Sequence, residues 1–202
     1  MKRSPAISAT ALAAVVFLAG CGTDAGSEQA GDTMPGMDHG SMSHAPSSSD
    51  ATGHNSADTM FAQMMMVHHQ QAVEMSEMVL AKDGLDPEIV RLAENIKAAQ
   101  GPEIETMSTW LRNWGEPAHM SGEMPMDGMI SSEGLAQLQA AQGTEASRLF
   151  LTQMIAHHEG AVAMAEEEAA NGSNPEAVEL ATSMASGQGT EIQKMNGLLA
   201  AL

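Results

Sequence analysis

Two short segments of the sequence carry the same arrangement of histidine and methionine. Residues 64–75 read MMMVHHQQAVEM, and residues 154–164 read MIAHHEGAVAM. In each, a methionine stands three residues before a His-His pair and another follows seven residues after its first histidine. Thioether sulfur favours Cu(I) and imidazole nitrogen favours Cu(II), whereas Mg²⁺ and Ca²⁺ prefer oxygen ligands. These residue types predict a copper site with the ligands His68, His69, His157, His158, Met65, Met75, Met154 and Met164.

The same pattern also allows readings without copper. A histidine on an apolar helix face is usually a hydrogen-bonded core residue, and methionine fills cores readily. Imidazole pairs bind zinc as well. Three alternatives therefore stay open: a copper site, a zinc site, and a bundle that is structural or binds a protein partner without any metal.

Two polar segments hold more methionine and histidine where no core is expected. The chain has 19 Met but 3 Phe, 2 Trp and no Tyr, so core packing alone does not explain the methionine content. We expect these segments to capture metal ions for the main site. Their candidate ligands are Met34, Met37, His39, Met42 and His44 in the first segment and His119, Met120, Met124, Met126 and Met129 in the second.

Helices must position the main candidates, because apolar residues recur every three or four positions along most of the chain. A first helix is expected from Ser56 to about residue 82, where Asp83-Gly84 ends it. Asp86-Pro87 and Asn174-Pro175 are typical helix starts, an N-cap followed by proline. The remaining helices are expected over about 87–114, 132–141, 144–170 and 175–202, and no strand pattern of any length is present.

The helical region is an internal repeat of residues 58–114 and 144–202. Residues 61–75 match residues 150–164 at an offset of 89, and a Q-x-x-E-I-x-x-M pattern recurs after each at an offset of 88. Two such helical hairpins predict an all-α four-helix bundle with pseudo-twofold symmetry. If the first and third long helices pack against each other, the four imidazoles and their flanking thioethers share one interior; the sequence leaves open whether the two pairs form one site or two.

The N-terminus predicts export. Lys2 and Arg3 precede an apolar stretch too short to span a bilayer, and Leu18-Ala19-Gly20-Cys21 resembles a bacterial lipobox. We expect residues 1–20 to be a lipoprotein signal peptide and Cys21 to carry a lipid that anchors the protein to a membrane of the cell envelope. Residues 21–57, rich in Gly, Ser, Asp and Ala, are the expected disordered tether to a domain over 58–202. Cys21 is the only cysteine, so no disulfide forms within one chain.

The charge of the chain limits the classes of molecule that it is expected to bind. The formal net charge is −18, and removal of the first twenty residues leaves six basic and 26 acidic residues, a net charge of −20. Such a protein does not attract nucleic acid or an anionic membrane through its charge. Metal ions are the expected ligands, with a copper-exchanging protein of the envelope as a further partner.

The repeated motifs resemble one known family. The pattern F-x-x-x-M-x-x-H-H-x-x-A-V-x-M and the glutamine-glutamate pattern after it are similar to domain-of-unknown-function family 305, over residues 58–202. The resemblance implies a ferritin-like four-helix fold, copper binding at the cell envelope through the matched histidines and methionines, and a role in copper tolerance or handling. One position departs from it, because Asp58 precedes Phe61 in the first motif but Ser147 holds that place in the second.

The sequence favours a binding protein over an enzyme. A di-iron centre in such a bundle needs Glu-x-x-His, and no glutamate stands three residues before a histidine in either pair. A blue-copper site needs a cysteine thiolate, and no nucleophile set or phosphate-binding loop is evident. Turnover of Cu(I) under oxygen would indicate the alternative of copper oxidation. We expect a solvated acidic face formed by Glu74, Glu77, Glu159 and Glu166–Glu168.

Overall fold

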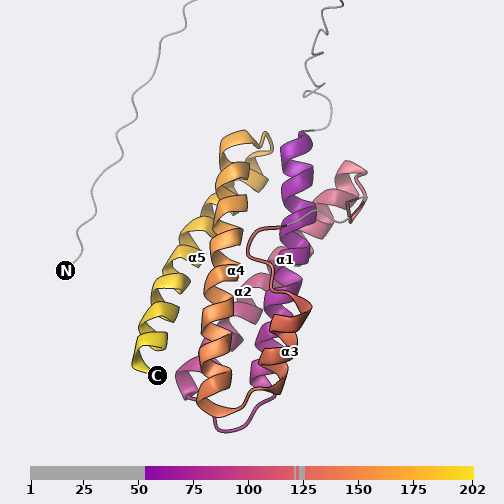
Figure 1. Ribbon diagram of the computed structural model, residues 1–202. Coiled ribbons are helices and arrows are strands. Elements are labelled where there is room, and N and C mark those ends of the chain that lie inside the picture. The colour runs from indigo at the N-terminus through magenta and orange to yellow at the C-terminus, as the bar shows by residue number, and fades with distance from the viewer. Residues whose placement is uncertain (1–52, 121, 123–125) are drawn as a thin grey trace, which may run out of the picture. The chain divides into compact units, whose positions relative to one another are not determined.

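The computed structural model describes residues 53–120, 122 and 126–202, and within them every regular element is a helix. The predicted all-α class is confirmed, and four long helices with one short helix form the bundle (Figure 1). None of the described helices is long and apolar enough to cross a membrane. The helices are α1 (Ser56–Leu80), α2 (Pro87–Trp114), α3 (Ser132–Ala140), α4 (Gly143–Asn171) and α5 (Pro175–Ala201).

The helix starts follow the local sequence. Asp86 and Asn174 accept hydrogen bonds from the first backbone N–H groups of α2 and α5, and each is followed by proline. Asn55 and Asp58 form a capping box at the start of α1. Helix α1 thus begins two residues before the predicted start of the domain and takes the last two residues assigned to the tether. Residues 1–52, with the predicted signal peptide and Cys21, lie outside the described residues.

The long helices pack as two hairpins. Helix α1 packs along α2, and α4 packs along α5; α1 and α4 join the two hairpins at the centre. The short helix α3 packs against α1 and α4 (Figure 1). The two repeated hairpins therefore form the pseudo-symmetric bundle that the sequence predicts.

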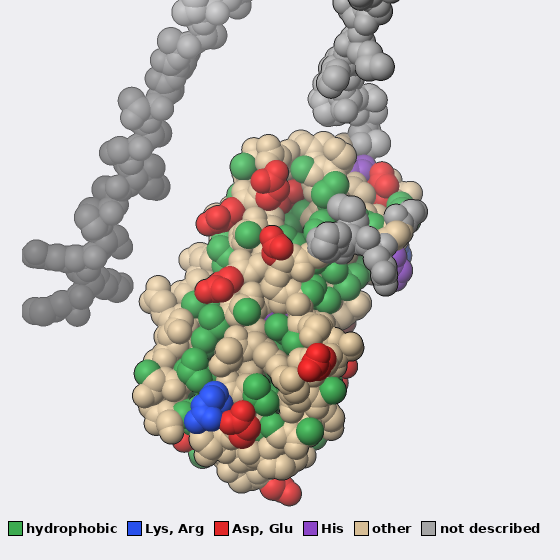
Figure 2. Space-filling model, viewed as in Figure 1, with side chains coloured by type: hydrophobic (Ala, Val, Ile, Leu, Met, Phe, Trp, Pro, Cys, Tyr) green, Lys and Arg blue, Asp and Glu red, His purple; other side chains and the backbone are tan. Residues whose placement is uncertain are grey.

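Acidic side chains are scattered over the surface in Figure 2, and basic side chains are visible on that face only near its lower end.

Two apolar clusters fill the bundle, one toward each end of the α1–α4 contact. The first contains Phe61 and Met65 of α1 with Ala161 and Ala165 of α4. In the second, Met75 of α1 lies with residues from the N-terminal half of α4, Phe150, Leu151 and Met154. On both helices the histidine pair falls between the residues of one cluster and those of the other. The fold therefore places the His-His pairs at the middle of the bundle.

The end of the loop between α2 and α3 crosses this middle region. Gln71 binds the backbone of Ile130 twice, through Nε2 to the carbonyl oxygen at 2.9 Å and through Oε1 to the N–H at 2.7 Å. Gly128 has a φ of 83° and lies against the backbone of α4, while the carbonyl of Asp127 lies against Gly160. A Cβ at either glycine would collide with backbone atoms. Glycine is thus required for the loop to approach α4 so closely.

Candidate metal centre

The four histidines meet at the α1–α4 contact. His68, His69, His157 and His158 all have 0% exposed surface. The His68 and His157 rings lie 3.6 Å apart between centroids at 35°, and the His157 and His158 rings lie 6.4 Å apart. The structure thereby brings both predicted pairs into one place, which we call the four-histidine centre.

Most nitrogen atoms of the four-histidine centre have no hydrogen-bond partner. Both ring nitrogens of His68 and of His157 are buried and unpartnered, and so is Nδ1 of His69 and of His158. The backbone of Asp127 approaches the His68 ring without completing a hydrogen bond to it. A buried polar atom without a partner costs about 1–3 kcal/mol. Six such atoms at one place indicate a ligand-binding site and not ordinary core packing.

Glutamates of the outer helices hold the other two nitrogens. The Nε2 atom of His69 lies 2.8 Å from Oε2 of Glu103 on α2, and Nε2 of His158 lies 2.8 Å from Oε2 of Glu191 on α5. A carboxylate on Nε2 selects the tautomer with hydrogen there, so the lone pair of the neutral ring is on Nδ1. Each glutamate therefore orients a ring so that Nδ1 remains available to a metal ion.

These two glutamates were not predicted as site residues, although the sequence holds a signal for them. Glu103 and Glu191 occupy the same place in the recurring Q-x-x-E-I-x-x-M pattern. An acid that recurs in step with a repeated histidine, on the neighbouring helix of each hairpin, is a candidate hydrogen-bond partner for it.

Burial keeps the two central rings neutral. Burial first, and then the neighbouring histidines His69 and His158, lower the pKa of His68 to about 3. Burial likewise lowers the pKa of His157 to about 2, with added repulsion from the charges that the other three histidines would carry. At neutral pH both imidazoles thus keep a free lone pair, which is the state that binds metal.

The predicted methionine ligands flank the histidines in two pairs. Met65 is fully buried in the first apolar cluster, and the partly buried Met164 packs against that cluster. Met75 and Met154 are fully buried in the second cluster. Two thioethers therefore lie toward each end of the four-histidine centre, in apolar surroundings that suit a soft donor.

The donor types of the centre fit copper. Among the described residues, no three side chains of His, Cys, Asp or Glu already form a closed set of metal ligands. The His68 and His157 rings are tilted at 35° to each other, with their centroids 3.6 Å apart.

The candidate ligands in the polar segments have different environments. His119 is exposed, and Met120, Met126 and Met129 are partly buried in the loop that leads to α3. These four residues are not part of the four-histidine centre. The remaining candidates lie outside the described residues: Met34, Met37, His39, Met42, His44 and Met124.

One member of the predicted acidic face is buried, so that part of the prediction is wrong. Glu74, Glu77, Glu159, Glu166 and Glu167 are exposed, but Glu168 is only 1% exposed. Burial raises the pKa of Glu168 to about 8, and the nearby carboxylate of Asp58 adds to the rise. Hydrophobic spacing did not reveal this residue because its partner lies on another helix.

Asp58 is the carboxylate beside the buried Glu168. It accepts hydrogen bonds from the backbone N–H groups of Asn55 at 2.6 Å and of Asn174 at 2.9 Å, and from Ser173. Burial alone would raise the pKa of Asp58, but these bonds and one from Glu168 lower it overall. Ser147, its counterpart in the second repeat, binds only the carbonyl oxygen of Gly143, and α4 lacks a side-chain cap. The two repeats thus differ at this position, as the sequence indicates.

Comparisons with known proteins agree with this architecture. The family described as "Domain of unknown function (DUF305)" matches residues 58–199. A solved DUF305 structure from Streptomyces coelicolor, provisionally named a secreted protein, has a TM-score of 0.67 and 35% identity, over 75% of this chain and 95% of that one. A DUF305 fragment from Deinococcus radiodurans has a TM-score of 0.67 and 32% identity, over 73% and 98% of the two chains.

A third solved relative carries metal. CopM in its Cu(I)-bound form has a TM-score of 0.61 and 36% identity, over 71% of this chain and 96% of that one. CopM has also been solved in Cu(II)-bound, silver-bound and apo forms. The comparison with curated proteins finds no match.

Proposed function

This chain belongs to the DUF305 family, and from that premise we propose that it binds copper at the four-histidine centre. The observation that carries the proposal is the set of six buried ring nitrogens without partners on His68, His69, His157 and His158. A core that binds no ligand is not expected to retain six unpaired polar atoms, because each of them lowers the stability of the fold. The copper-bound and silver-bound forms of CopM support the choice of metal.

The surroundings of the centre favour Cu(I) as one bound state. Methionine thioethers lie toward both ends of the imidazole cluster, in apolar surroundings. Thioether sulfur discriminates in favour of monovalent copper, while the imidazoles also accept Cu(II). Both oxidation states are therefore expected to bind, with the thioethers contributing to Cu(I).

Zinc is the second candidate, because one observation favours it. The His69–Glu103 and His158–Glu191 pairs have the carboxylate–histidine arrangement that commonly supports zinc ligands. Zinc gains nothing from the methionines, so the two metals differ in their dependence on Met65 and Met154.

We further propose that the protein sequesters copper or hands it on outside the cytoplasm, without catalysing a reaction. The lipobox-like sequence before Cys21 and the provisional name of the Streptomyces relative support export. The acidic composition supports an affinity for cations over nucleic acid. In this role a lipid on Cys21 tethers the domain to the envelope, and a copper-exchanging protein is the expected partner.

A titration of the protein with Cu(I), Cu(II), Ag(I) and Zn²⁺ tests the proposal. We expect uptake of Cu(I) and Ag(I) that shifts the imidazole NMR signals of His68 and His157, and loss of that uptake at the centre when both are replaced by leucine. A Met65→Leu and Met154→Leu variant should weaken Cu(I) binding and leave Zn²⁺ binding unchanged. Imidazole signals that ignore every metal offered would refute the proposal.

A further inference from the structure

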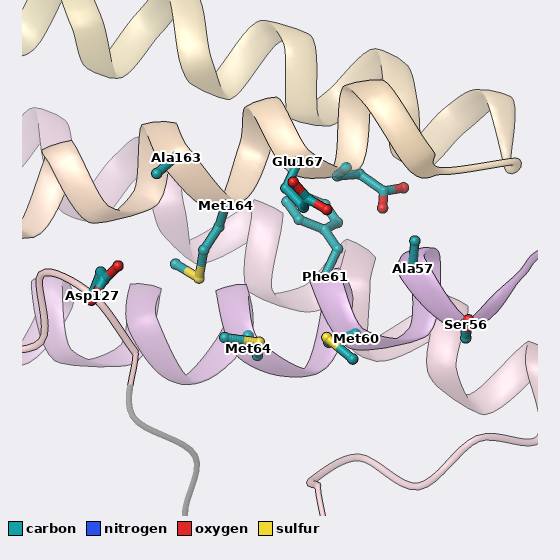
Figure 3. A pocket seen from close by; sticks show the side chains of 10 residues that line it. Ser56, Ala57, Met60, Phe61, Met64, Asp127, Ala163, Met164 and Glu167 are labelled. Carbon is teal, nitrogen blue, oxygen red and sulfur yellow. The ribbon is translucent and has the colours of Figure 1, made fainter.

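A second group of methionines lies at the surface and shares Met164 with the methionines that flank the four-histidine centre. A pocket of about 440 Å³ opens between α1 and α4, and its lining includes Met60 and Met64 of α1 and Met164 of α4. Figure 3 shows the three side chains around this pocket, with Met164 reaching from α4 toward the two methionines of α1. Three thioethers from two helices therefore border one space, which we call the methionine pocket.

Core packing does not account for Met60, and it accounts only in part for Met64 and Met164. Met60 is 46% exposed, and among the described residues only it and the C-terminal Leu202 are large apolar side chains with that degree of exposure. Met64 and Met164 are only partly buried. Exposed apolar surface contributes nothing to folding, since stabilisation follows the area removed from water. Their position suggests a role other than stability.

The second repeat lacks the two methionines that α1 contributes to the pocket. The positions that match Met60 and Met64 at an offset of 89 hold Leu149 and Gln153. Gln153 donates a hydrogen bond through Nε2 to the carbonyl oxygen of Gly134 at 3.0 Å, so α3 binds this part of α4. The α1 positions Met60 and Met64 thus have no thioether counterpart on α4.

The charges around the pocket favour a cation. Its polar lining includes the exposed carboxylates of Asp127 and Glu167, and no lysine or arginine belongs to the lining. A divalent cation such as Ca²⁺ needs six or more oxygen ligands, which this largely apolar pocket does not supply. A soft monovalent cation matches three thioethers with negative charge nearby.

The methionine pocket also lies next to the four-histidine centre. Asp127 lines the pocket, and the backbone of the same residue approaches the His68 ring. His68 follows Met64 by one helical turn on α1, and His157 lies two turns before Met164 on α4. Asp127 therefore contacts both the pocket and the His68 ring.

We propose that Met60, Met64 and Met164 form a surface site that takes up one Cu(I) ion and from which the ion passes to the four-histidine centre. This inference rests on the proposed function, because it takes copper as the cargo of the centre. It adds a place at which copper enters the protein. It also adds selection for the monovalent ion before copper reaches the imidazoles, which accept either oxidation state.

Silver titration followed by NMR of the methionine methyl groups tests the site. Ag(I) is a soft monovalent ion that undergoes no redox change under these conditions, and the methyl signal of a methionine reports directly on its sulfur. The protein is compared with a Met60→Leu, Met64→Leu variant, because Met164 also flanks the four-histidine centre. The matched control carries two leucines at methionines outside the pocket, Met78 and Met107, since Met-to-Leu exchange largely preserves volume.

We expect the methyl signals of Met60, Met64 and Met164 to shift on silver addition. The pocket variant should bind one Ag(I) ion per chain fewer than the parent protein, and the control variant should bind the same number. Uptake of silver without a shift of these three signals, or an unchanged number of ions in the pocket variant, would overturn the inference. If the three methyl signals shift while the imidazole signals of His68 and His157 do not, the pocket site stands and the four-histidine centre fails.

Discussion

Replacing His157 with leucine is expected to stabilise the metal-free protein, although the residue is completely buried. The backbone of His68 approaches the His157 ring, but neither buried ring nitrogen completes a hydrogen bond, and leucine fills a similar space with no polar atom. Removing an unsatisfied buried polar group gains about 1–3 kcal/mol in the free energy of unfolding. For a domain of this size each kcal/mol moves the melting temperature by about 2–4 °C. The expected rise is therefore roughly 2–12 °C.

The same change should remove the stabilisation by metal. A ligand that binds only the native state at one hundred times its Kd adds about 2.7 kcal/mol to the free energy of unfolding. Thermal melts with and without Ag(I) measure both effects in one experiment. The parent protein should melt higher with silver, whereas the His157→Leu variant should start higher and gain much less.

His158→Leu is the matched control for this prediction. His158 is the next residue on α4 and is equally buried, but its Nε2 is hydrogen-bonded to Glu191 at 2.8 Å. Leucine there loses that bond, so the metal-free protein should be no more stable than the parent. If His157→Leu instead lowers the free energy of unfolding by more than about 1 kcal/mol, the nitrogens are satisfied in solution and the reasoning about unpaired atoms is wrong.

Three further predictions follow from the contacts around the centre. Glu103→Gln with Glu191→Gln should weaken copper affinity about 10- to 100-fold, measured by competition with a chelator, while the circular dichroism spectrum stays unchanged. Glu168 has a raised pKa of about 8, so between about pH 5 and pH 8 the unfolded chain has released this proton while the folded protein retains it, and the free energy of unfolding should fall as the pH rises. Glu168→Gln should flatten this slope in thermal melts across that range. An unchanged slope would contradict the assignment. Gly160→Ala should displace the loop at Asp127 and raise hydrogen exchange around the centre, whereas Gly187→Ala, with open space around its Cβ position, should be neutral or stabilising.

The copper-binding candidates at the centre followed from the sequence because they depend on local spacing. A histidine three residues after a methionine shares its helix face wherever that helix forms, and proline after Asp86 or Asn174 starts a helix through contacts within one turn. The repeat then required the two hairpins to pack in the same way. For these reasons the helix order and the four-helix bundle were predictable, whereas the sequence left open whether the two histidine pairs meet in one place, which the packing of α1 against α4 decides.

Tertiary structure alone decided which atoms of these residues are free. Glu103 and Glu191 are hydrogen-bonded to Nε2 of His69 and His158, and the other six ring nitrogens stay unpaired. This arrangement depends on contacts between residues more than thirty positions apart in the chain. The burial of Glu168 depends on Asp58 across more than one hundred residues. Helical periodicity carries no information on such distant partners, because it describes one helix face and not the side chains that another helix brings to it.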